Sequence, residues 1–225
     1  GLAGGNYDHK EYFEKNGMNE NRIFVFPMVV NNNKFIKKPI KIKTTVNYYF
    51  IGKFYKRKNI SFLLEAFVHA KQKNKNIELH LIGSGDKYHS LKSKYDSYEY
   101  IHFYGDVNNQ ELGNYMEDFH YIILPSLHEP WGLVINESYS SGKLALVSNR
   151  VGCINDFKDL MQDWMIFDPK NIKSLIHTIL VSSKYSDYFD KAKMASDFMK
   201  KKWNYSYYEK NMHDFINQIS NKNDW

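Results

Sequence analysis

The glutamates Glu129 and Glu137, with seven residues between them, are the strongest chemical signal in this chain. The apolar run Tyr121–Leu124 predicts a buried strand that Pro125 ends, and residues 133–141 predict a helix. Glu129 therefore lies in the loop beyond the strand, and Glu137 lies about one turn into the helix. The spacing places two carboxylates around a strand-to-helix junction.

Such a junction suits a phosphorylated sugar. The first N–H groups of a helix have no intrahelical partner, and together with the helix dipole they form an anion site. Gly132 would let a phosphate approach the backbone. Glu137 could accept hydrogen bonds from a ribose diol, and Glu129 from a sugar beyond the phosphates. A glutamate near a helix N-terminus can also do no more than complement the helix dipole. A capping box at Glu137 is excluded, because Val134 occupies the position that requires Ser or Thr.

The stretch from Leu124 to Glu137 resembles the signature of the group 1 family of retaining glycosyltransferases, which have the two-domain GT-B architecture. That signature has a Glu-x7-Glu pair after a strand that ends in Pro-Ser, with an aromatic-Gly pair inside, here Trp131-Gly132. Further family landmarks occur in the family's order along most of the chain: Phe50-Ile51-Gly52-Lys53 with Lys58, Leu81-Ile82-Gly83-Ser84-Gly85, Ile101-His102-Phe103-Tyr104-Gly105, Val151-Gly152 and Phe167-Asp168-Pro169. Chance is a poor explanation for so many landmarks in one order.

The resemblance implies a role for each matched position. Glu129 would orient the donor sugar, and Lys53 and Lys58 would stabilise the charge of the leaving diphosphate, so these three are the expected catalytic residues. Glu137 would hold the ribose, and residues 105–107 would cup the base. The expected donor-binding set is Gly52, Gly83, Gly105, Val107, Trp131, Gly132, Leu133, Val134 and Glu137.

Some positions add to this pattern or depart from it. His128 adjoins Glu129 and is a further candidate for the site. Lys53 occupies the position where the family usually has Arg, which implies a weaker or rearranged phosphate contact because Lys is a point charge. Asn59 replaces a common Gly, and residues 163–166 replace the family's usual Asn-Gly.

The activity implied by the resemblance is transfer of a sugar from a UDP- or GDP-sugar, with retention, to a glycan or lipid-linked acceptor. The acceptor would be bound by an N-terminal domain that these 225 residues lack, so we expect nucleotide binding with little or no transfer by the chain alone. No cofactor or metal is expected, since the family is generally metal-independent and no Asp-x-Asp motif occurs. Two alternatives stay open: a non-catalytic nucleotide-sugar-binding module, and a GT-B sugar synthase or phosphorylase.

Other kinds of site fit the sequence less well. Gly83-Ser84-Gly85, followed by Asp106, suggests a dinucleotide fingerprint, but Tyr88 occupies the position of its third glycine. The glycines are better explained as a turn beside the donor phosphates. The histidines on predicted strands show no pair at metal-ligand spacing, so we expect packed or surface side chains at His80, His102 and His120.

The composition limits the partners and the cellular compartment that we expect for this chain. A formal net charge of +6 permits nucleic-acid binding, but the chain has no helix-turn-helix signature, zinc spacing or Arg-rich arm, so no nucleic-acid partner is expected. The single cysteine, Cys153, excludes an internal disulfide framework and fits a reducing compartment. No apolar run in the sequence approaches the roughly 20 residues of a membrane span. We therefore expect a cytoplasmic protein, with peripheral contact at the inner membrane face as an addition.

The predicted elements give the fold class. Strands alternate with amphipathic helices from residue 45 onward, which predicts an α/β, Rossmann-like parallel sheet with helices on both faces and a helical C-terminal tail. We expect four parts: the tail of an N-terminal domain (1–31), a linker (32–44), the donor-binding domain (45–185) and helices that cross back toward the N-terminal domain (186–225). Ligands of such sheets bind beyond the carboxyl ends of the strands, where the motifs lie.

Two features lie outside the predicted sheet. The linker carries a group of lysines, which we interpret as solvated, with a membrane-facing role as the alternative: Lys34, Lys37, Lys38, Lys41 and Lys43. In the tail, Ser206 and Glu209 have capping-box spacing and predict a helix start.

Overall fold

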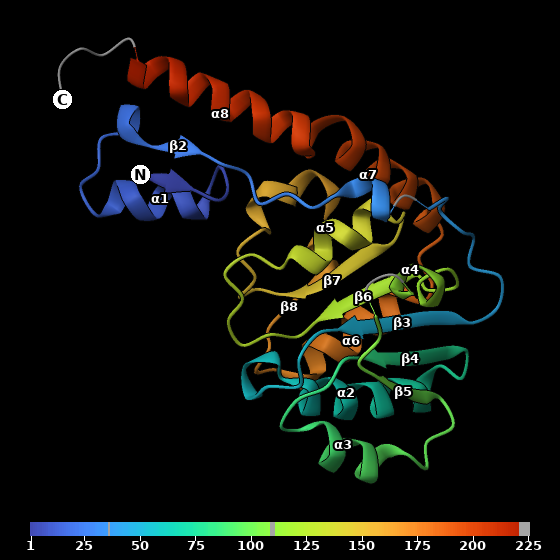
Figure 1. The fold of residues 1–225 in the computed structure, drawn as a ribbon. Helices are drawn as coiled ribbons and strands as arrows, with labels where there is room; N and C mark the ends of the chain where they lie inside the picture. Colours follow the sequence, from blue (N-terminus) through green and yellow to red (C-terminus); the bar gives the residue numbers. More distant parts are fainter. Residues whose placement is uncertain (36, 109–110, 221–225) are drawn as a thin grey trace.

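The computed structural model describes residues 1–35, 37–108 and 111–220, and its main feature is a six-stranded parallel sheet (Figure 1). The strands are β3 (Val46–Ile51), β4 (Ile77–Ile82), β5 (Ile101–Gly105), β6 (Tyr121–Leu124), β7 (Leu144–Ser148) and β8 (Ile166–Phe167). They lie in the order β5-β4-β3-β6-β7-β8. The predicted fold class is confirmed.

Helices cover both faces of this sheet. They are α2 (Ile60–Lys73), α3 (Tyr88–Tyr95), α4 (Leu112–Tyr115), α5 (Leu133–Ser140), α6 (Ile172–Ser182) and α7 (Tyr188–Lys202). Helices α2 and α6 pack together on one face, and α5 packs against α7 on the other (Figure 1). Short 3-10 helices span Glu20–Arg22, Asn32–Lys34, Lys56–Lys58, Asn155–Leu160 and Asp163–Met165.

The central strand shows how the sequence fixes these two layers. Tyr48 and Tyr49 are neighbours on β3, so their side chains point to opposite faces of the sheet. The Tyr48 hydroxyl donates to the Ile179 carbonyl oxygen in α6 at 3.0 Å, and the Tyr49 hydroxyl donates to Ser138 Oγ in α5 at 2.7 Å. Both tyrosines are fully buried and hydrogen-bonded, so one layer of helices is anchored on each side.

A smaller unit lies at the other end of the molecule. Strands β1 (Leu2–Ala3) and β2 (Phe24–Val25) form a two-stranded parallel sheet beside α1 (Asp8–Lys15). Helix α8 (Tyr205–Ser220) runs along this unit (Figure 1), and its Phe215 ring lies 4.7 Å from Phe24 between centroids. No helix within the three described ranges is long and apolar enough to cross a membrane.

The helix start predicted in the C-terminal tail lies elsewhere in the structure. The capping box at Ser206 is wrong: α8 begins at Tyr205, and Asn204 Oδ1 accepts from the Tyr207 N–H at 3.0 Å. The domain boundaries expected from the sequence stay a prediction.

The histidines on the strands are packed side chains, as expected, but two of them lie side by side, which their spacing in the sequence did not indicate. His80 on β4 and His102 on β5 are cross-strand partners, and their rings stack with centroids 4.7 Å apart. Burial lowers the pKa of His80 to about 3, so its imidazole is neutral. His120 fits the expectation of a packed side chain, since its Nδ1 accepts from the Asn47 N–H at 3.0 Å.

Candidate active site

The strand order places a crevice between β3 and β6. The chain proceeds from β3 to β4 and β5 on one side, and then returns to build β6, β7 and β8 on the other. Loops that leave β3 and β6 therefore diverge at their carboxyl ends, where ligands of such sheets bind. Lys58 follows β3 and Glu129 follows β6, so the topology brings these two predicted residues together.

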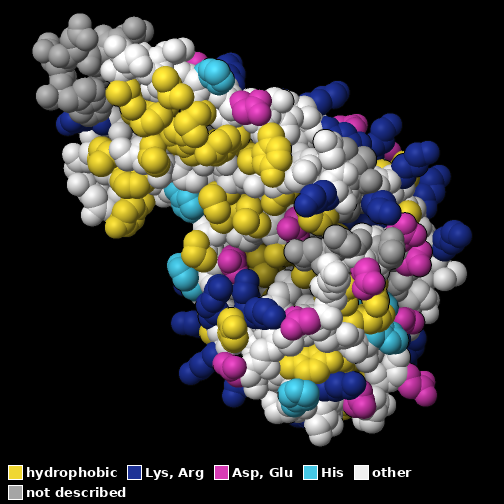
Figure 2. Space-filling view, in the orientation of Figure 1, with side chains coloured by type: hydrophobic (Ala, Val, Ile, Leu, Met, Phe, Trp, Pro, Cys, Tyr) yellow, Lys and Arg dark blue, Asp and Glu magenta, His cyan; other side chains and the backbone are white. Residues whose placement is uncertain are grey.

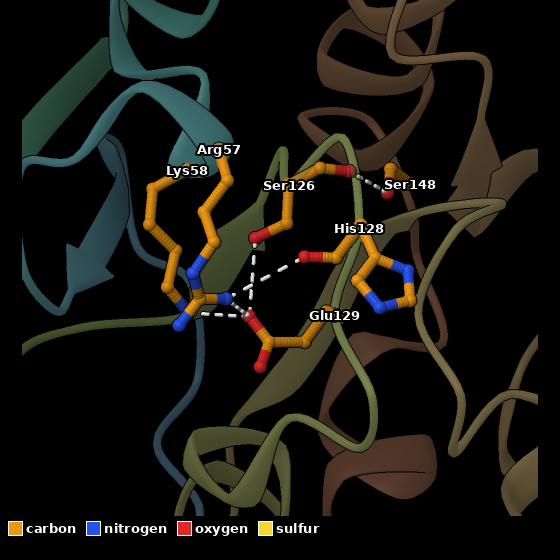
Figure 3. Close-up of polar contacts among 6 residues, drawn as sticks. All are labelled: Arg57, Lys58, Ser126, His128, Glu129 and Ser148. Carbon is orange, nitrogen blue, oxygen red and sulfur yellow. Dashed lines mark hydrogen bonds and ion pairs between the residues drawn. The ribbon is translucent and has the colours of Figure 1, made fainter.

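Glu129 is the centre of a polar cluster (Figure 3). Its Oε2 accepts a short hydrogen bond from Lys58 Nζ, a contact from Ser126 Oγ at 3.3 Å and one from Arg57 Nη1 at 3.5 Å. The Glu129 and Lys58 side chains are each 11% exposed, whereas that of Arg57 is 51% exposed. The cluster is an ion pair mostly withdrawn from water, with a second cation at its open side.

Backbone hydrogen bonds fix the loop that carries Glu129. The Glu129 N–H donates to the Arg150 carbonyl at 3.0 Å, and the Gly152 N–H donates to the Glu129 carbonyl at 2.9 Å. The Leu127 N–H donates to the Arg57 carbonyl at 2.8 Å, which joins the loops after β3 and β6. A Cβ on Gly152 would lie 2.0 Å from the Pro130 carbonyl oxygen, so this close packing requires glycine. Glu129 is thus held in place by its backbone as well as its carboxylate.

Asn59 explains one departure from the family pattern. Its φ of 58° and ψ of 34° are left-handed, a conformation that favours Gly and, among other residues, Asn. Its Nδ2 also donates to the Pro169 carbonyl at 3.0 Å. Asn59 therefore makes the turn that a glycine would make and ties the Lys58 loop to the Phe167-Asp168-Pro169 segment.

The start of α5 lies beside this cluster. Gly132 caps the helix with a φ of 98°, and a Cβ there would meet Leu124 at 3.1 Å. The N–H groups of Leu133 and Val134 belong to the first helical turn, where no intrahelical acceptor exists. Burial raises the pKa of Glu137 to about 7. A half-buried carboxylate and a helix N-terminus are therefore both present, as the sequence predicted.

Trp131 lies differently from the neighbouring residues of the motif. Its side chain is 3% exposed, stacks on Trp203 at 5.6 Å and donates from Nε1 to Asn136 Oδ1 at 3.0 Å. Asn136 Nδ2 in turn donates to the Met28 carbonyl at 2.8 Å. The Trp131 ring therefore belongs to the core, and only its backbone faces the junction before α5.

Two predicted glycines bring the ends of β3 and β4 into contact. A Cβ on Gly83, whose φ is 124°, would lie 2.0 Å from the Gly52 carbonyl oxygen. The Gly83 N–H also donates to the Gly105 carbonyl at 2.7 Å. Gly52, Gly83 and Gly105 therefore lie at one edge of the sheet, and half-buried Val107 follows them. The turn predicted at Gly83-Ser84-Gly85 continues into a hydrogen bond from the Tyr88 N–H to the Gly85 carbonyl at 2.9 Å, and its place beside the donor phosphates stays a prediction.

Lys53 lies apart from the Glu129 cluster. Its Nζ contacts Asp106 Oδ1 at 3.1 Å and Ser84 Oγ at 3.3 Å, so it bridges the ends of β4 and β5. Hydrogen bonds from Ser84 and Lys53 lower the pKa of Asp106. Two of the three expected catalytic residues, Glu129 and Lys58, are thus in contact, and Lys53 is held by a carboxylate.

Several members of the site were missed from the sequence. Arg57 precedes Lys58 in a run of three basic residues in the loop that follows β3, a signal that could have singled it out. Ser126 belongs to the Pro-Ser that ends β6. Asp106 was weighed only as a dinucleotide ligand. The His128 side chain is exposed and points away from the Glu129 carboxylate, and its carbonyl oxygen is what faces Arg57 (Figure 3).

Basic side chains gather around this edge of the sheet. Figure 2 shows Lys and Arg below a hollow that separates the α8 end of the molecule from the sheet. Lys53, Lys56 and Arg57 are exposed. Cys153, in contrast, is fully buried, and burial raises the pKa of its thiol, so this residue packs in the core.

Known proteins share this architecture. Sucrose-phosphate synthase from Thermosynechococcus elongatus superposes with a TM-score of 0.77 at 18% identity, over 97% of this chain and 57% of that one. HepE from Anabaena, solved with UDP and glucose, superposes with a TM-score of 0.76 at 13% identity, over 96% of this chain and 62% of that one. At such identities the likeness shows the fold.

Sequence comparison identifies the family. The uncharacterized glycosyltransferase YqgM of Bacillus subtilis is 30% identical over 118 residues, which are 50% of this chain and 33% of that protein. The chain thus spans about a third of the length of the curated relatives it matches. The sequence profile of Glycosyl transferases group 1 matches residues 31–193, the greater part of the chain. This protein therefore belongs to the group 1 family of glycosyltransferases.

Proposed function

We propose that this chain is the donor-binding half of a retaining glycosyltransferase that uses a nucleoside-diphosphate sugar, a UDP- or GDP-sugar. The observation that carries the proposal is the Glu129–Lys58 pair at the crevice between β3 and β6. A carboxylate and an ammonium group withdrawn from water at that edge can orient sugar hydroxyls and meet a diphosphate within one site.

Each group has a task in this proposal. Lys58 and the N–H groups at the start of α5 stabilise the charge that develops on the leaving diphosphate. Glu129 already faces Lys58 and Arg57, which suits a carboxylate that orients the donor sugar better than one that attacks it. Glu137 binds the ribose hydroxyls. Lys53 exchanges Asp106 for a phosphate oxygen when the donor arrives, and the backbone at Gly105 and Val107 contacts the base.

The acceptor is a glycan or a lipid-linked sugar in this proposal, and it is bound outside these residues. Apolar side chains lie exposed at the end of the molecule formed by β1, β2 and α8 (Figure 2), among them Leu2 and Ile216 at 59% and 51%. We propose that the rest of the enzyme packs there. In this proposal transfer needs no metal or cofactor and takes place in the cytoplasm. Peripheral membrane contact through the lysines of residues 34–43 is the alternative to their being solvated.

A nucleotide panel tests the proposal on the chain itself. UDP, GDP, ADP and their sugars are added in turn, and the thermal midpoint is measured. A ligand at about 100 times its Kd adds about 2.7 kcal/mol, and each kcal/mol raises Tm by about 2–4 °C in a chain of this size. We expect one base to raise Tm by several degrees, with little sugar transfer by the chain alone. No shift with any of these nucleotides would contradict the proposal.

A further inference from the structure

Away from the Glu129 site, strands β4 and β5 carry a cluster of side chains of the types that bind metal ions. Glu78 and His80 are two residues apart on β4 and so share one face of the sheet, and His102 is the cross-strand partner of His80 on β5. One ligand atom from each of the three side chains lies within 4.8 Å of the others. The cluster combines two imidazoles and one carboxylate.

The ring nitrogen Nε2 of His80 is buried without a hydrogen-bond partner among the described residues, which leaves it available to a metal ion. His80 is 8% exposed, and its Nδ1 lies 2.9 Å from the Tyr104 hydroxyl oxygen. A buried polar atom that has lost water without gaining a partner is rare in proteins. A second partner on Nδ1 is also the usual way in which a metal-binding histidine is oriented.

The other two ligands keep the cluster open to solvent. His102 Nε2 and Glu78 Oε2 lie 3.0 Å apart, and their side chains are 35% and 38% exposed. An ion can therefore enter from their side and insert between them. Packing holds the His80 ring in place, because it stacks on His102 at 4.7 Å and lies tilted against Phe119 at 4.6 Å, both between ring centroids.

We propose that Glu78, His80 and His102 form a binding site for a transition-metal ion of the Zn²⁺ type. Two imidazoles with one carboxylate suit Zn²⁺, whereas Mg²⁺ and Ca²⁺ prefer sites built from oxygen. Metal–ligand bonds of about 2.0–2.2 Å require the three side chains to draw together, and the two partly exposed ones, Glu78 and His102, have room to do so. The bound ion joins the edge strand β5 to β4.

Metal titration tests this site. The chain is freed of metal and titrated with Zn²⁺ by calorimetry, and the absorption spectrum of the Co²⁺ form reports the ligand geometry. We expect one ion per chain. Glu78→Gln and His102→Gln should each weaken binding by at least about tenfold, and Tyr104→Phe by about tenfold because it acts through His80. His69→Gln, at an exposed histidine on α2, is the matched control and should bind as the wild type does.

Circular dichroism of each variant is the check that it is folded. Both ligand substitutions are at partly exposed side chains, so we expect the fold to tolerate them. Absence of Zn²⁺ binding to the wild-type chain overturns the proposal. Binding that is unchanged in both Glu78→Gln and His102→Gln also overturns it, because the ion then lies elsewhere.

Discussion

The ion pair between Glu129 and Lys58 joins function to stability at the scale of single residues. Each side chain is 11% exposed, so each charge has lost most of its water. A buried pair contributes little net stability, but removing one partner leaves the other charge uncompensated. Ser126 and Arg57 also contact the Glu129 carboxylate. The site therefore holds a charge arrangement that a donor can use and that the fold depends on.

Glu129→Gln should lower the free energy of unfolding by about 3 kcal/mol, since Lys58 loses its anion in a mostly buried place. The double variant Glu129→Gln with Lys58→Gln should recover part of that loss, because no charge is then left unpaired. Urea unfolding of the wild type, both single variants and the double variant gives the coupling. Additive losses would contradict a paired role.

Glu137 should make stability depend on pH. Its pKa is raised from 4.5 to about 7 in the folded chain, so its contribution is present below about pH 4.5 and is lost as the pH rises through about 7. Glu137→Gln cannot ionise, so it should become more stable relative to wild type over that window, by at most about 3 kcal/mol.

Urea unfolding at about pH 5 and about pH 8 measures the difference. The control is Glu99→Gln, at an exposed glutamate, which should keep the wild-type pH profile. If Glu137→Gln also keeps that profile, the Glu137 carboxylate is not the group that titrates.

Close backbone contact between strand ends is the decisive feature at the scale of elements. Gly83 has a φ of 124°, and its missing side chain leaves room for the Gly52 carbonyl oxygen, 2.0 Å from where a Cβ would lie. This contact sets the ends of β3 and β4 at one level. Lys53, which follows β3, can then reach Asp106, which follows β5.

Gly83→Ala should therefore destabilise the fold by at least about 2–3 kcal/mol and weaken nucleotide binding. Gly113→Ala in α4 is the matched control. Among the residues that the structure describes, its Cβ would meet only Lys37 Cε, at 3.8 Å, so we expect a change within about 1 kcal/mol, in the stabilising direction. Thermal and urea unfolding check both. A harmless Gly83→Ala would show that the strand ends can move apart.

The elements also show what the sequence can predict. Strands such as β6 and β7 are buried apolar runs between turn residues, so their positions follow from local pattern. Contacts across strands depend on the spatial order β5-β4-β3, which no local spacing reveals. For this reason the pairing of Lys53 with Asp106 and of His80 with His102 was missed. The cap at Asn204 was missed because Ser206 offered an equally good local pattern.

At the scale of the whole molecule, the chain has one complete sheet and one small unit. The β1–β2 sheet has only two short strands, which are marginal without further packing. Asn136 and Trp203 both donate to the Met28 carbonyl, at 2.8 and 2.9 Å, so this segment is tied to the main fold. Apolar side chains of this unit and of α8, among them Leu2 and Ile216, are exposed, which is why we propose that the rest of the enzyme packs there.

The central claim is that the crevice between β3 and β6 binds the diphosphate of a sugar donor. Calorimetric titration of the preferred nucleoside diphosphate into wild type, Lys58→Gln and Lys56→Gln tests it most directly. Lys56 is exposed in the same 3-10 turn, so it controls for loss of positive charge. A lost charge-assisted contact costs about 1.5–3 kcal/mol, so Lys58→Gln should weaken binding by about tenfold or more, with Lys56→Gln close to wild type. Equal affinity for all three, or no binding to the wild type, would contradict the account.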